Sequence, residues 1–151
     1  MVLHKLEIMI RKIFGTRKIN KVGFEDIVNF VNKKTRNVIL INTLPSCDQN
    51  VLIRHTTPYD NEEKVINDIL KNGCTHIIII YGKNCCDETI DNKYFQLINL
   101  GYIEEKLFIY YGGLLEWCLL QDAYDVTNFP TTNKCVDIIK FRSSSVIENY
   151  L

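Results

Sequence analysis

Apolar residues recur along the chain in two patterns that alternate and predict strands and helices in turn. Short continuous apolar runs are typical of strands buried on both faces, and they cover residues 38–41, 51–53, 76–81 and 107–111. Apolar residues three or four positions apart indicate helices between them, over 24–31, 65–70, 90–98 and 114–119. Segment 136–141 is interpreted as a last strand or an extended segment.

This alternation predicts an α/β domain with a mainly parallel sheet covered by helices on both sides. The length of 151 residues suits one domain with one core. Run 76–81 is the most hydrophobic, so we expect it at the centre of the sheet. Binding sites in such sheets lie beyond the carboxyl ends of the strands. The loop Gly82–Asp87 is therefore the expected functional surface, with Gly112 and Gly113 bordering it.

The domain is assigned to residues 21–142 and is followed by a tail at 143–151. Residues 1–20 form a basic extension before it. The apolar residues of this extension fall on one face of a helix: Leu3, Leu6, Ile10 and Ile13. Its basic residues lie elsewhere on that helix: Lys5, Arg11 and Lys12. We interpret the extension as a helix packed on the domain. The alternative is a helix lying on a membrane surface.

Charge and composition exclude several classes of function. Lys plus Arg and Asp plus Glu both number 18, so zero net charge gives no reason to expect nucleic-acid binding. No apolar run approaches the roughly 20 residues that span a bilayer, and charges within residues 1–13 interrupt any signal-peptide core. We therefore expect an intracellular, cytoplasmic protein without a membrane partner. The six cysteines include no C-x-x-C pair and the three histidines are scattered, so we expect free thiols, no metal site and no cofactor.

Segment 110–117, Tyr-Tyr-Gly-Gly-Leu-Leu-Glu-Trp, resembles the rhodanese-like domain, in which a strand ends in Gly-Gly and a helix bearing a Trp follows. Further segments resemble that family in the same order: 38–42, 52–55, 77–81, 97–102 and 128–131. The resemblance covers about residues 21–141. It implies a rhodanese-like three-layer α/β/α fold around a five-stranded parallel sheet.

The resemblance also implies a reactive loop. Active members transfer sulfane sulfur through a cysteine persulfide on the first residue after the central strand. The backbone N–H groups of the loop form a nest that holds an anion. Here that first residue is Gly82, and Asp87 stands where an arginine often ends the loop. We therefore expect a non-catalytic binding or regulatory module, whose partner is a small sulfur-containing anion or a protein.

The alternative is a sulfurtransferase that uses Cys85 or Cys86 as the sulfur acceptor. These are the catalytic candidates within the predicted anion-binding loop, which comprises Gly82, Lys83, Asn84, Cys85, Cys86 and Asp87. Against this reading, the carboxylates of Asp87, Glu88 and Asp91 should raise a thiol pKa, whereas a reactive thiol needs electropositive surroundings. Cys47, on a loop at the same sheet end, could serve as a resolving thiol.

A third reading is a phosphatase of the related cell-cycle type. That chemistry requires the motif C-x5-R, because the arginine clamps the phosphate while the loop N–H groups bind its oxygens. No cysteine of this chain has an arginine six positions later. We therefore discount the phosphatase.

Overall fold

The computed structural model describes residues 18–33 and 35–150. The helix expected within residues 1–20 falls mostly on residues 1–17, which lie outside the described residues. None of the described helices is long and apolar enough to cross a membrane.

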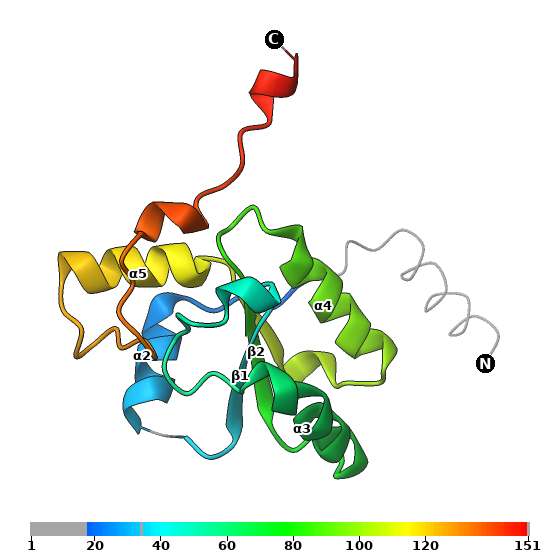
Figure 1. Cartoon of the computed structure of the whole chain (residues 1–151). Helices are drawn as coiled ribbons and strands as arrows, with labels where there is room; N and C mark the ends of the chain where they lie inside the picture. Colours follow the sequence, from blue (N-terminus) through cyan, green and yellow to red (C-terminus); the bar gives the residue numbers. More distant parts are fainter. Residues whose placement is uncertain (1–17, 34, 151) are drawn as a thin grey trace.

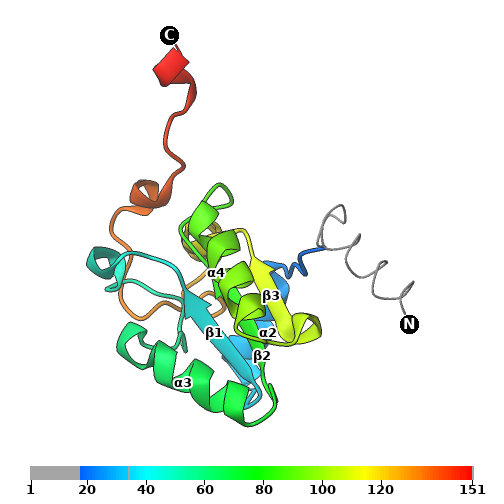
Figure 2. The same cartoon turned by 90° about the vertical axis from the view of Figure 1, so that its right-hand side faces the viewer.

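Three parallel strands form the sheet: β1 (Val38–Asn42), β2 (Ile77–Tyr81) and β3 (Leu107–Tyr110). Their order is β1-β2-β3, so the most hydrophobic run lies at the centre as predicted. Leu40 pairs with Ile79, which in turn pairs with Phe108. The carboxyl ends of all three strands therefore lie at the same end of the sheet, and the loops that follow them meet there (Figures 1 and 2).

Four helices cover the sheet, two on each face, as the spacing predicts. Helices α2 (Phe24–Lys33) and α5 (Gly113–Ala123) pack on one face, and α3 (Tyr59–Lys71) and α4 (Glu88–Asn99) on the other (Figures 1 and 2). Side chains alternate along β2, since Ile79 and Tyr81 join the α2–α5 core while Ile78 and Ile80 join the α3–α4 core. Because both faces of β2 are buried, its sequence is continuously apolar.

The expectation of five strands is wrong for the described part of the chain, in which the sheet has three. The two expected runs outside this sheet, 51–53 and 136–141, form no strand. Beside β1 and β3 the chain makes only isolated bridges, Thr56 with Leu40 and Lys21 with Ile109. The run 51–53 cannot continue as a strand, because the chain turns immediately after it. His55 has φ 69°, and the Thr56 N–H donates to the Ile53 carbonyl at 3.2 Å.

The second strand expectation, over 136–141, is also not met. Residues Ile138–Phe141 form a short 3-10 helix, η3. Phe141 is fully buried in the α2–α5 core and Ile138 packs against it, while Ile139 and Lys140 remain exposed. Buried positions three residues apart fit one turn of helix and do not fit the alternation of a strand.

Trp117 and the segment after α5 complete the α2–α5 core. The indole is fully buried, its Nε1 donates to the Pro130 carbonyl at 3.2 Å, and Phe129 packs edge-on at 5.2 Å between ring centroids. Trp117 therefore serves packing, as its helical spacing predicts, and its one polar atom is satisfied.

The hydroxyl of Tyr81 links the end of β2 to the turn after residue 53. It accepts a hydrogen bond from the Ile53 N–H at 3.2 Å and lies 2.8 Å from the Thr56 hydroxyl. Tyr81→Phe leaves a buried N–H without a partner, so we expect a loss of about 1–3 kcal/mol in the free energy of unfolding. Urea denaturation measures it, with the exposed Tyr59→Phe as control. Equal stabilities of the two variants would contradict this role.

Candidate functional site

The loop Gly82–Asp87 leaves the carboxyl end of β2 and leads into α4, which begins at Glu88. It lies at the end of the sheet formed by the carboxyl ends of all three strands, and the N-terminus of α5 adjoins it (Figure 1). The site is therefore built from the ends of a central strand and of two helices.

Gly82 is buried, and the space where a side chain would extend from it is already filled. A Cβ atom there would lie 2.5 Å from Asp87 Oδ2, 2.7 Å from Ile90 Cγ1 and 2.8 Å from Thr43 Oγ1. All three distances are shorter than Cβ contacts allow. The chain thus lacks the nucleophile at this position and also lacks room for one.

The carboxylate of Asp87 lies against the backbone at both ends of the loop. Its Oδ2 accepts a hydrogen bond from the Lys83 N–H at 2.9 Å, and its Oδ1 accepts from the Thr89 N–H at 3.1 Å. The Thr89 hydroxyl lies 2.5 Å from the same Oδ1. Asp87 is therefore the N-cap of α4 and places a negative charge at the positive end of that helix. The backbone groups that could hold an external anion here hold a carboxylate of the same chain.

The rest of the loop backbone is fixed by α5. The N–H groups of Leu114 and Leu115 donate to the carbonyls of Gly82 and Lys83, both at 2.9 Å. Gly113 makes this approach possible, because its φ is +64° and a Cβ on it would lie 2.7 Å from the Gly82 oxygen. The Gly-Gly pair thus joins helix and loop, although only its second member has a positive φ.

A C-terminal strap, defined here as residues 138–143, lies against the loop. Asn84 is buried and donates to the Phe141 carbonyl at 2.8 Å, while its Oδ1 accepts from the Cys86 N–H at 2.9 Å. The Ser143 hydroxyl lies 3.2 Å from the same oxygen. One buried amide therefore fixes the loop and holds the strap to it.

Asp48, from the 3-10 helix η1 (Ser46–Asp48), adds an electrostatic link. It forms ion pairs of 3.1 Å with both Lys83 and Lys140. Burial raises the pKa of Asp48, but hydrogen bonds and charge attraction from the two lysines outweigh it, so this pKa lies below its usual value. The one positive charge that the sequence places in the loop is consequently neutralised. Spacing along the sequence gave no signal for Asp48 or Lys140.

A hollow of about 950 Å³ lies between the loop and the C-terminal residues. Its ionisable lining residues balance, with three basic (Lys83, Lys140, Arg142) and three acidic (Asp87, Glu88, Glu148). It therefore offers no net positive field to an anionic ligand.

The two loop thiols, Cys85 and Cys86, are exposed, and their sulfur atoms lie 3.9 Å apart. The pKa of Cys85 is raised, first by its hydrogen bond to Cys86, then by the charge of that thiol, by burial and by Glu116. The carboxylates that the sequence suggested, those of Asp87, Glu88 and Asp91, are not among these causes. The Asp91 carboxylate accepts a hydrogen bond from the Tyr111 hydroxyl at 2.5 Å. Cys47 is exposed on η1, and no hydrogen bond between described residues joins it to either loop thiol. Within the described ranges no group of three His, Cys, Asp or Glu residues could hold a metal ion.

Comparison with known proteins identifies the fold. No family model matches the sequence, and no curated protein matches it significantly. Among solved structures, a yeast protein tyrosine phosphatase of the rhodanese family is similar, with a TM-score of 0.55 and 11% identity over 78% of this chain and 94% of that one. The BH2092 protein of Bacillus halodurans is similar with a TM-score of 0.54 and 11% identity, over 78% of this chain and 80% of that one. The As–Sb reductase of Leishmania major is similar with a TM-score of 0.50 and 13% identity, over 71% of this chain and 79% of that one.

These similarities, together with the parallel sheet between two helical layers, show that the chain has a rhodanese-like α/β fold. At such low identity the likeness extends to the fold alone.

The ion pairs of Asp48 generate a prediction about pH. Because the folded-state pKa of Asp48 is lowered, its stabilising effect is fully present above the unfolded value of about 3.9 and is lost as the pH falls through the lower folded value. We expect Asp48→Asn to be less stable than wild type at pH 7, by up to about 1 kcal/mol because both lysines are a third exposed. The difference in the free energy of unfolding between the two proteins should disappear as the pH falls below about 4. Denaturation at pH 7, 5 and 3 measures it, and a gap that stays constant with pH would contradict the account.

Proposed function

We propose that this chain is a non-catalytic rhodanese-like module that acts by binding, as a regulatory or scaffolding domain. The observation that carries the proposal is the Asp87 carboxylate, which lies where an external anion would bind and fills the space beside Gly82. Persulfide chemistry at the first loop position would need a thiol at that position and N–H groups free to bind the anion. Position 82 is a glycine, and Asp87 accepts the hydrogen bond from the Lys83 N–H.

Two further features support the proposal. Lys83 is paired with Asp48, so the loop has no unpaired cation to attract thiosulfate or a persulfide anion. The C-terminal strap is attached to the loop through Asn84, which stabilises this filled arrangement. With the nest occupied from within, a protein partner is a better fit than a small sulfur-containing anion.

An alternative function is sulfur transfer through Cys85 or Cys86, which is favoured by the exposure of both thiols on this loop. The raised pKa of Cys85 opposes it, because the thiolate is the nucleophile and a higher pKa reduces its fraction at neutral pH. The phosphatase among the structural neighbours does not change this reading, since no cysteine here is followed by an arginine six positions later.

A thiosulfate:cyanide sulfurtransferase assay separates the two functions. We expect the wild type and the Cys85→Ser/Cys86→Ser variant to give the same background rate. A clear rate in the wild type that disappears in the double variant would establish the enzyme and refute the binding module.

The filled nest can be tested independently of activity. Asp87→Ala removes the internal carboxylate and frees the N–H groups of Lys83 and Thr89, so these two amides should show saturable NMR shifts with thiosulfate. Glu88→Ala is the matched control, because it removes the same charge one residue later and leaves the nest filled. We expect no saturable shift in the wild type or in the control. Saturation of equal affinity in all three proteins would contradict the occupied nest.

A further inference from the structure

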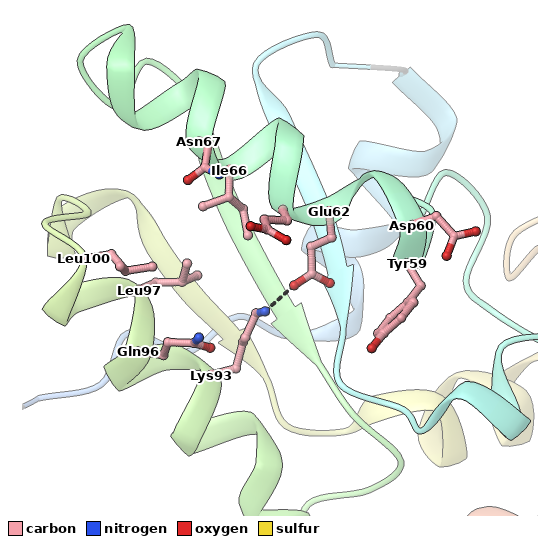
Figure 3. A pocket seen from close by; sticks show the side chains of 10 residues that line it. Tyr59, Asp60, Glu62, Ile66, Asn67, Lys93, Gln96, Leu97 and Leu100 are labelled. Atoms are coloured by element: carbon pink, nitrogen blue, oxygen red, sulfur yellow. Dashed lines mark ion pairs between the residues drawn. The ribbon is translucent and has the colours of Figure 1, made fainter.

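A groove separate from the Gly82–Asp87 loop lies between α3 and α4. Two adjoining cavities of about 570 and 530 Å³ form it and share four lining residues: Tyr59, Glu62, Lys93 and Gln96. Figure 3 shows Glu62 of α3 and Lys93 of α4 pointing toward each other as an ion pair across the groove. One end reaches Thr43 and the other reaches Leu100, the residue that follows α4.

The surface of this groove carries exposed apolar side chains and acidic side chains that are not in ion pairs among the described residues. Tyr59 and Leu100 are large hydrophobic side chains that are 58% and 56% exposed. Asp60 and Glu63 are exposed on α3, and neither belongs to an ion pair between described residues. Two exposed apolar side chains with free carboxylates beside them suit a helix that has one apolar face and basic flanks.

The first 17 residues of this chain have that composition. They contain four basic residues and one acidic, whereas residues 18–151 contain fourteen basic and seventeen acidic. The zero net charge therefore divides into +3 on the segment and −3 on the remainder. The apolar positions 3, 6, 10 and 13 follow the spacing of anchors for a helix in a groove.

Asn20, near the first described residue, lies beside the connection between α4 and β3. It donates to the Glu104 carbonyl at 2.8 Å, and Lys21 pairs in parallel with Ile109. The segment before residue 18 is therefore attached next to the connection that leads from Leu100 to the start of β3. Seventeen helical residues span about 25 Å, compared with about 20 Å for the 13 residues of α3. The segment is long enough to cover the groove from its Leu100 end.

We propose that residues 1–17 dock as an amphipathic helix into the α3–α4 groove of their own chain. The apolar face covers Tyr59 and Leu100, and Lys5 and Lys12 approach Asp60 and Glu63. This docking is independent of the function proposed for the loop, and its test uses no activity.

Hydrogen exchange of the full-length protein, followed by mass spectrometry, tests the docking. Amides of residues 3–13 should be protected in the wild type. In Asp60→Lys/Glu63→Lys they should exchange about tenfold faster, since reversing two surface charges turns attraction into repulsion. Both positions are exposed, so the fold should tolerate the changes. Asp122→Lys/Asp137→Lys makes the same change of charge at exposed sites away from the groove and should leave the protection unaltered.

A charge swap makes the test specific. Lys5→Glu/Lys12→Glu should lose protection as the groove variant does, and combining the two pairs of substitutions should restore it. Carbodiimide coupling of an equal mixture of ¹⁴N- and ¹⁵N-labelled protein should join Lys5 or Lys12 to Asp60 or Glu63 within one label.

Three results would overturn the proposal. Protection that is absent, or insensitive to the groove charges, would exclude this groove. Cross-links of mixed label would assign the occupant to a second copy of the chain. Protection that appears only with anionic lipid vesicles would assign the segment to a membrane surface.

Discussion

The capping of α4 by Asp87 is the interaction on which the arrangement of the loop depends. The Asp87 carboxylate accepts hydrogen bonds from the N–H of Lys83 in the loop and from the N–H of Thr89 in the first turn of α4, where a negative charge is also favourable. The same interaction thus stabilises the start of α4 and fixes the loop to it. It is also the basis of the proposal that the loop does not hold an external anion.

Gly82 and Asp87 are best understood as one unit. A side chain at position 82 would collide with the Asp87 carboxylate and with Ile90, so the glycine is required by the aspartate that caps the next helix. Asn84 and Asp48 extend this unit to the C-terminal strap through one buried amide and two ion pairs. Three segments far apart in the sequence, η1, the loop with the start of α4, and the strap, therefore hold each other in place.

The parallel order of the strands and the two helical layers were predictable because burial of both sheet faces leaves a direct record in the sequence. Run 77–81 has no polar residue, and the helices around it show their apolar spacing. The edges of the sheet left no such record. Residues 51–53 are as apolar as a strand, but hydrogen bonding by Thr56 and Tyr81 makes the chain turn there. Segment 138–141 likewise buries Phe141 and packs Ile138 as a turn of helix.

By itself, the sequence determined the α/β class, the central strand, the place of the loop and the absence of a cysteine at its first position. These depend on local pattern and on residue identity, which the chain displays directly. Only the tertiary structure decided what fills the nest, what neutralises Lys83 and where the strap lies. Those depend on the directions of side chains from residues far apart in the sequence, such as Asn84 and Ser143 or Asp48 and Lys140, and no spacing along a single chain encodes those directions.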